Sequence, residues 1–214
     1  MNNKKTNLII ISIIVLSFLS ALYLYPQLPD RVASHWNAQG QIDGYMPKFW
    51  GVFLMPAITL AIFLLFLLIP IIDPLKKNID KFRNYFNWLI ILIVVFLLYV
   101  YSLTVFWNLG YRFNMTLLMT PAVGLLFFYI GVILKHAERN WFIGIRTPWT
   151  LSSDVVWKKT HQLGAKLFKV AGIIAILGIF FAENALWFAI IPAIASSLFL
   201  LVYSYFEHKK TAVK

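Results

Sequence analysis

The sequence predicts an all-α integral membrane protein, a bundle of about six transmembrane helices with both termini on the cytoplasmic side. Of its 214 residues, 61% are hydrophobic and only 13% are charged. Soluble domains have about half apolar and roughly a quarter charged residues, so this chain has too little charge to cover a water-exposed surface. The apolar residues come in long charge-free runs, and the basic residues gather in alternate loops. These three observations indicate that the helices lie in the lipid bilayer, whose lipids are therefore the first expected partner of the protein.

Six runs reach or approach the length of a transmembrane helix, because about 20 apolar residues at 1.5 Å each cross ~30 Å of hydrocarbon. The predicted spans are residues 8–25, 49–72, 88–107, 116–134, 165–182 and 185–206. The first is expected to remain as an uncleaved helix, since it exceeds the roughly 7–15 apolar residues of a signal peptide. The fifth holds Lys166 and Lys169 in its first turns, and their stems can lie along apolar surface while the ammonium groups reach the headgroups.

The lysine and arginine residues predict the orientation. With both termini in the cytoplasm, 16 of the 19 lie on the cytoplasmic side, and only Arg31, Lys48 and Arg112 lie outside. Short loops rich in Lys and Arg stay in the cytoplasm, so the bias favours this topology. Topology therefore explains the net charge of +11, and no direct contact with nucleic acid is expected.

The chain is expected to form one folded unit with two parts. Residues 1–75 hold two spans and an outside loop, residues 26–48. Residues 76–214 hold four spans and a long cytoplasmic segment, residues 135–164. A strong tight-turn dipeptide, Asp43-Gly44, favours a small hairpin in the outside loop.

Small residues in the fifth span indicate close helix packing. Ala171 and Ala175 are four residues apart, and Gly178 and Ala182 repeat the spacing. Small side chains let helix backbones approach closely in lipid. Packing inside the bundle explains the pattern more simply than dimerisation.

Several functional classes lack their usual residues. There is no cysteine, no charged residue or histidine near the middle of any span, and no phosphate-loop, zinc-protease or nucleophile-elbow motif. Ion-coupled transporters usually carry charged groups inside the membrane. A transport site built from Ser102, Thr104 and Asn108 stays open as an alternative. No catalytic residue, metal site or cofactor is predicted.

The outside loop carries the first group of candidate contact residues: His35, Trp36, Asn37, Gly40, Asp43 and Tyr45. Trp36 suits an anchor at the membrane interface, where aromatic rings favour the headgroups. Alternatively, the loop is a recognition surface in which the aromatic rings supply area and the polar residues supply directed contacts. A metal site formed by His35, Asp43 and Asp30 is a weaker alternative, since one imidazole with two carboxylates often arises by chance.

The cytoplasmic segment carries the second group: Gly144, Arg146, Thr147, Pro148, Trp149, Thr150, Trp157 and His161. Ser152 or Ser153 suits a helix N-cap, with Asp154 favouring the helix dipole in the first turn. The helix would then continue into the fifth span.

The helix after this N-cap has one apolar face. Trp157, His161, Gly164 and Phe168 share that face by their spacing. This predicts an amphipathic helix at the membrane interface, with Trp157 at headgroup depth. The alternative is that the segment folds back onto the bundle.

At these two segments the chain resembles the SdpI family of bacterial membrane immunity proteins. The string Gly144-Ile145-Arg146-Thr147-Pro148-Trp149-Thr150-Leu151, followed by Trp157, is similar to the family signature. The outside loop resembles an N-terminal domain of unknown function with a P-x-H-W-N-x-x-G-x-x-D-G-like pattern. This sequence has Ala33 where that pattern has proline.

The resemblance implies a non-enzymatic protein that protects its cell against a secreted peptide toxin and holds a transcriptional repressor at the membrane. On this hypothesis Arg146 supplies directional hydrogen bonds, Trp149 a stacking surface, and Thr147 and Thr150 local hydroxyl contacts. The variant Arg146→Lys should then protect cells less well, because the point charge of an ammonium group cannot replace the planar guanidinium group and its several hydrogen-bond donors. The alternatives are a small transporter or exporter, and a membrane-embedded enzyme that uses His161 and Arg146.

Overall fold

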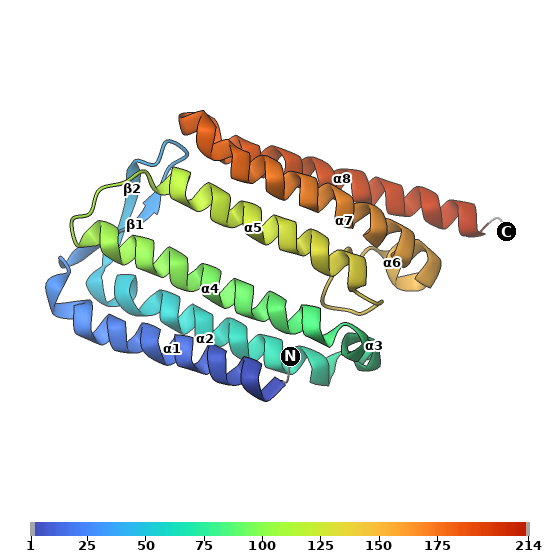
Figure 1. Cartoon of the computed structure of the whole chain (residues 1–214), viewed down its shortest axis with the longest axis horizontal. Coiled ribbons are helices and arrows are strands. Elements are labelled where there is room, and N and C mark those ends of the chain that lie inside the picture. The colour runs from blue at the N-terminus through green and yellow to red at the C-terminus, as the bar shows by residue number, and fades with distance from the viewer. Residues whose placement is uncertain (1–2, 213–214) are drawn as a thin grey trace.

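The computed structural model describes residues 3–212 and contains, within that range, six helices long and apolar enough to cross a membrane (Figure 1). They are α1 (Asn3–Leu24), α2 (Lys48–Ile72), α4 (Arg83–Asn108), α5 (Met115–His136), α7 (Asp154–Leu177) and α8 (Ala185–Ala212). The shorter elements are η1 (Tyr25–Gln27), β1 (Arg31–Trp36), β2 (Ile42–Pro47), α3 (Lys76–Lys81), α6 (Pro148–Ser152) and η2 (Gly178–Asn184). The predicted all-α class with six spans is confirmed.

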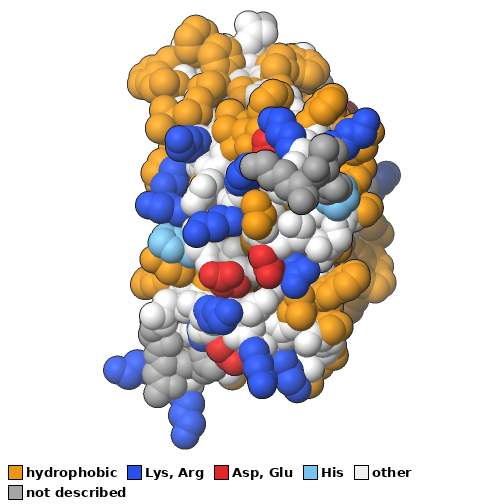
Figure 2. All heavy atoms as spheres, turned by 90° about the vertical axis from the view of Figure 1, so that its right-hand side faces the viewer, with side chains coloured by type: hydrophobic (Ala, Val, Ile, Leu, Met, Phe, Trp, Pro, Cys, Tyr) orange, Lys and Arg blue, Asp and Glu red, His pale blue; other side chains and the backbone are white. Residues whose placement is uncertain are grey.

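The helices run back and forth between two ends of the molecule. The β1–β2 hairpin and η2 lie at one end, the hairpin end, whereas α3, α6 and both termini of the described chain lie at the other, the motif end (Figure 1). Lys and Arg side chains are spread over the motif end, with few acidic side chains between them (Figure 2). The placement of the motif end in the cytoplasm stays a prediction from this charge bias.

The six long helices pack as two groups of three. α1, α2 and α4 contact one another, α5, α7 and α8 contact one another, and α4 meets α5 between the groups. Two tyrosines bridge this junction: the Tyr99 hydroxyl donates to the Leu118 carbonyl at 3.1 Å, and the Tyr129 hydroxyl donates to the Tyr85 carbonyl at 2.8 Å. Polar groups within a membrane need such internal partners. The predicted division of the chain at residue 75 stays a prediction.

Glycines bring α5 and α7 into close contact. A Cβ atom on Gly172 of α7 would lie 2.5 Å from the backbone nitrogen of Phe128 on α5. One on Gly131 of α5 would lie 2.7 Å from the carbonyl oxygen of Ala165 on α7. The backbones therefore touch where no side chain intervenes. Ala171 is also buried within the chain, as expected for internal packing of the small residues.

The predicted hairpin is present, but its turn is not where the sequence indicated. β1 and β2 pair antiparallel, with the turn between Asn37 and Gln41. Asp43 and Gly44 lie inside β2, so the prediction that they form the turn is wrong. Gly44 faces His35, where an added Cβ would lie 2.8 Å from the histidine Cβ. Glycine at this position allows the two strands to approach closely.

Two buried clusters mark the core. The larger lies toward the motif end and includes Phe82 and Phe86 together with Trp157. The smaller lies under the hairpin, around Val32 of β1 and Val52 of α2.

Candidate functional site

The chain after α5 folds into a tight loop organised by Asn140. This side chain is fully buried. Its amide nitrogen donates to the carbonyls of Glu138 and Ile143 at 2.8 and 2.9 Å, and its oxygen accepts from the amides of Phe142 and Ile143 at 2.9 and 2.6 Å. One side chain thereby satisfies several backbone groups that no helix or strand pairs.

Gly144 and His161 fit together directly behind this loop. Gly144 has φ of +122°, and an added Cβ would lie 2.3 Å from His161 Nε2. That nitrogen accepts a hydrogen bond from the Ile145 amide at 3.0 Å, and Nδ1 pairs with the Trp157 carbonyl at 2.8 Å. Nδ1 therefore carries the proton, and His161 is a buried, neutral side chain that holds the loop to α7.

Thr147 and Thr150 form a reciprocal cap at the start of α6. The Thr150 hydroxyl accepts from the Thr147 amide at 2.9 Å and donates to the Ile145 carbonyl at 2.7 Å. The Thr147 hydroxyl accepts from the Thr150 amide at 3.2 Å and lies 3.1 Å from the Ser204 hydroxyl on α8. Pro148 occupies the first helical position, where its missing N–H costs nothing. The two hydroxyls therefore cap α6, and that of Thr147 also ties it to α8.

Trp157 lies inside the protein, as expected from the alternative that this segment folds back onto the bundle, and the depth of the helix in the membrane stays a prediction. Its side chain is 3% exposed, stacks on the His161 ring with 3.8 Å between centroids, and donates from Nε1 to the Ala137 carbonyl at 2.8 Å. The apolar face of this helix therefore packs on the bundle. A 3.6-residue period marks a buried face but does not distinguish protein from lipid as the neighbour. The N-cap prediction is confirmed: Ser153 accepts from the Val156 amide, and the helix continues into the fifth span.

The exposed part of the motif is small. Arg146 is exposed, and its Nη1 donates to the Trp141 carbonyl at 2.7 Å. The Trp141 ring is half exposed beside it, and Pro148 is exposed as well. Trp149 is partly buried, because its ring packs edge-on against Tyr205 of α8 at 5.2 Å. Arg146 and Trp141 are thus the motif residues best placed to meet a partner.

A carboxylate that the sequence reasoning missed ties the loop to the other helix group. Asp73, at the end of α2, is 2% exposed. One of its oxygens accepts from the Leu75 amide at 2.6 Å, and the other accepts from the Trp141 amide at 2.9 Å. The Asn78 side chain adds a bond to the Arg139 carbonyl at 2.8 Å. The only sequence signal for Asp73 was an acidic residue directly after a span.

The predicted contact residues of the hairpin differ in exposure. His35 pairs with Asp43, and both are exposed along with Tyr45. Trp36 is instead partly buried and packs edge-on against Trp107 of α4, with 5.8 Å between ring centroids. The Arg112 guanidinium lies 3.7 Å from the centre of the Trp107 ring. The hairpin therefore carries an exposed polar pair next to a partly buried aromatic pair.

The metal alternative finds no support in the described residues. Asp30 lies 3.8 Å from the Lys48 ammonium group. Within residues 3–212, no three His, Cys, Asp or Glu side chains are close enough to hold a metal ion.

Asn37 and Gly40 shape the turn of the hairpin and dock it on α5. The Asn37 side-chain oxygen accepts from the amides of Gln39 and Gln41, and its carbonyl accepts from the Thr116 hydroxyl at 3.2 Å. Gly40 has φ of +77°, and an added Cβ would lie 2.4 Å from Asn114 Oδ1. Since Asn114 is the N-cap of α5, the turn rests directly on the start of that helix.

Asn108 fixes β1 to α4. Its side chain accepts from the Ala33 amide at 2.8 Å and donates to the Ala33 carbonyl at 3.0 Å, in the manner of a neighbouring strand. A proline at position 33 has no N–H for the first of these bonds. The hydrogen bond from the residue 33 amide to Asn108 can therefore form in this chain because residue 33 is alanine and not proline.

A cavity of about 450 Å³ lies beneath the hairpin. Its walls are mostly apolar and come from α4, α5 and α8, while β1 and the turn form its roof. The Trp36 indole N–H is buried at this lining and has no hydrogen-bond partner among the described residues. The cavity thus offers mostly apolar surface, and one unsatisfied donor lies buried in a residue of its wall.

The two predicted groups of residues lie at opposite ends of the bundle (Figure 1). α5 connects them, since it begins under the hairpin and ends beside the motif loop. Its 22 residues span about 33 Å at 1.5 Å per residue. The hairpin and the motif therefore form two separate sites on one helix.

Comparison with known proteins identifies the family. Residues 136–204 match the model of the SdpI/YfhL protein family, and residues 12–60 match a domain of unknown function, DUF1648. The chain is also 32% identical over 208 residues to the immunity protein SdpI of Bacillus subtilis (strain 168), covering 96% of this chain and 97% of that protein. This chain belongs to the SdpI family.

The two family matches fall on the two sites. The SdpI match covers the whole Gly144–Thr150 loop and its supports on α7 and α8, and the DUF1648 match covers the entire hairpin. No solved structure matches the chain. The roles of the signature residues in this member of the SdpI family are therefore inferred from the buried hydrogen bonds that they form.

Proposed function

We propose that this chain is a membrane immunity protein that protects its cell against a secreted peptide toxin. The observation that carries the proposal is the similarity to an immunity protein along nearly the whole chain, through both ends of the bundle. A shared local motif would support much less, since one fold serves many functions.

The cavity under the hairpin is the proposed contact site for the toxin. A membrane-active peptide brings apolar side chains, which suit the mostly apolar walls. The Trp36 indole N–H is buried and has no partner among the described residues, so a shift of the ring on binding would let it donate to a peptide carbonyl in the cavity. The exposed pair of His35 and Asp43 lies at the rim on the same strands and would contact polar parts of the peptide.

The motif end is the proposed site for a cytoplasmic transcriptional repressor. Most of the signature is used internally, by His161 and the two threonines, so the contact would fall on exposed Arg146 and Trp141. Only one Arg146 hydrogen bond to the protein is present in the described chain, which leaves most of its donors for a partner. Loss of membrane recruitment of a fluorescently tagged repressor in Arg146→Ala, at a membrane level equal to that of wild type, is the expected result. Unchanged recruitment would contradict this part of the proposal.

Two other functions receive less support from the geometry. Ser102 and Thr104 donate to carbonyls one turn earlier, and Asn108 is bound to Ala33, so these side chains offer no free donors for a transport site. For an enzyme, His161 would need a free ring nitrogen, whereas Nε2 is bonded to the Ile145 amide of the motif loop and Nδ1 to the Trp157 carbonyl of α7.

The test is survival of a sensitive bacterium that expresses this chain and is challenged with secreted peptides from the organism that carries it. Wild type should protect, and Trp36→Ala should lose protection at equal membrane level. Trp50→Ala is the matched control, because Trp50 is an exposed tryptophan near the hairpin that does not line the cavity. Equal protection by Trp36→Ala would refute the cavity as the contact site, and absence of wild-type protection would refute immunity.

A further inference from the structure

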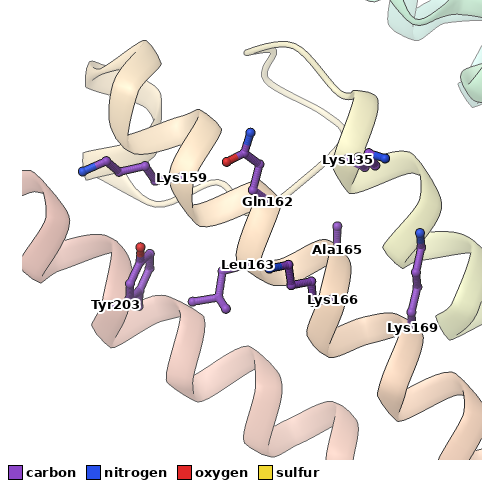
Figure 3. A pocket seen from close by; sticks show the side chains of 8 residues that line it. All are labelled: Lys135, Lys159, Gln162, Leu163, Ala165, Lys166, Lys169 and Tyr203. Atoms are coloured by element: carbon purple, nitrogen blue, oxygen red, sulfur yellow. The ribbon is translucent and has the colours of Figure 1, made fainter.

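A basic pocket unrelated to either site lies between α5, α7 and α8 near the motif end. It has a volume of about 620 Å³. Lys135 of α5 and Lys169 of α7 lie along one side of it, Lys166 lies at its centre, and Gln162 borders it above (Figure 3). We call Lys135, Lys166 and Lys169 the lysine basket. Lys159 and Tyr203 border the far side (Figure 3).

The charge of the lysine basket is not balanced within the described chain. Lys159 is neutralised by Glu207 at 2.8 Å, and that carboxylate also pairs with Lys210 at 3.0 Å. By contrast, no described carboxylate lies within 4.0 Å of any ammonium group of the basket. Three like charges around one pocket repel one another, so an anion from outside the chain would stabilise the arrangement.

The basket lies where an apolar surface begins. Because Gly131 of α5 touches Ala165 of α7, Lys166 is about level with Gly131, five residues before the end of α5. From Lys166 the same face of α7 continues through Val170, Ile173 and Leu177, each about half exposed. On a membrane protein such a face lies against acyl chains, and lysine side chains at its motif end are long enough to extend toward the headgroups.

Lys169 is held in position by its neighbours. An added Cβ on Gly131 would lie 2.7 Å from the Lys169 Cγ, so the lysine stem occupies the space that this glycine leaves open. Its ammonium group lies 6.0 Å from the centre of the Phe128 ring on α5. A long side chain that is already ordered loses less conformational entropy when it binds.

We propose that the lysine basket binds the phosphate headgroup of an anionic membrane phospholipid, whose acyl chains lie along the apolar face of α7. The ammonium groups contact the phosphate oxygens, and the Gln162 amide donates to the headgroup alcohol or ester. Basic pockets between transmembrane helices commonly bind headgroups in this way. The site is independent of the proposed immunity function, and it favours phosphatidylglycerol or cardiolipin over phosphatidylcholine.

The test is native mass spectrometry of the full chain in detergent, titrated with phosphatidylglycerol and, separately, phosphatidylcholine. The variant Lys135→Gln/Lys166→Gln/Lys169→Gln should weaken phosphatidylglycerol binding on the order of 100-fold, at roughly fivefold per lysine. The control is Lys76→Gln/Lys77→Gln/Lys209→Gln, which removes the same charge elsewhere at the motif end and should change affinity only a few-fold.

Further arms separate the possible sources of the effect. Replacing the three basket lysines by arginine keeps the charge and should retain binding, which distinguishes lost charge from a folding defect. Equal losses in the basket and control variants, or equal binding of both lipids, would overturn the proposal. Displacement of the lipid by millimolar inorganic phosphate would also overturn it, because the site would then bind a free anion.

Discussion

Replacing Gly144 by alanine tests whether the signature loop depends on its contact with His161. Two physical costs combine at this position. The residue has φ of +122°, where a side chain is strained, and the new Cβ would lie 2.3 Å from His161 Nε2. The imidazole must then move, and the buried Ile145 amide loses its acceptor.

The magnitude follows from these two terms. Left-handed strain on a non-glycine residue costs about 1–3 kcal/mol. A buried amide left without a partner costs a further 1–3 kcal/mol, roughly. Gly144→Ala should therefore lower the free energy of unfolding by about 2–6 kcal/mol.

Gly110→Ala is the matched control. Gly110 has φ of +106°, and an added Cβ there meets no atom within 4 Å. This variant carries the backbone strain alone and should cost about 1–3 kcal/mol. In a His161→Ala background, the cost of Gly144→Ala should fall to about that of Gly110→Ala, because the obstructing ring is gone.

The free energy of unfolding can be measured by circular dichroism during denaturation in mixed SDS micelles. Equal losses in the two glycine variants would refute the reasoning, since the His161 contact would then contribute nothing. An undiminished cost of Gly144→Ala without His161 would refute it as well.

Two further predictions follow from single contacts, and a third follows from the distribution of Lys and Arg. Asp73→Asn keeps only one of the two oxygens that accept from backbone amides, so it should lower the free energy of unfolding by about 1–3 kcal/mol. The control Asp80→Asn changes an exposed carboxylate and should lower it by under about 1 kcal/mol. Gly172→Ala places a Cβ 2.5 Å from an α5 backbone nitrogen and should lower the same quantity by roughly 1–3 kcal/mol; an unchanged value would disprove the close contact. Reporters fused after Lys81 and after Lys158 should both read cytoplasmic, and an external signal from either would contradict the orientation.

The hairpin shows how far local sequence patterns reach. Alternation of exposed and partly buried residues along β2 is consistent with a strand, and the loop does form a hairpin. The turn was misplaced because Asp43-Gly44 is a good turn dipeptide on its own. In the folded chain Gly44 is needed opposite His35, and the turn at Gly40 is selected by contact with Asn114. That contact joins residues far apart in the sequence.

The signature loop shows the same limit for the candidate site. Its residues were predicted from the sequence, yet most of them make contacts inside the protein: His161 accepts from the Ile145 amide, and Thr147 caps α6. Spacing placed Trp157 on an apolar face but could not tell whether lipid or protein covers it. Asp73 was missed, because its bond to the Trp141 amide joins residues 68 positions apart.

The sequence by itself determined the membrane class and the six spanning helices. Bilayer thickness fixes the length of an apolar run, and a backbone in lipid must satisfy its own hydrogen bonds, so composition and length suffice. Only the tertiary structure decided which helices form each group, which signature residues are buried, and where lysines gather without a carboxylate. Those outcomes depend on backbone contacts at residues such as Gly131 and Gly172, and on polar partners supplied by other helices.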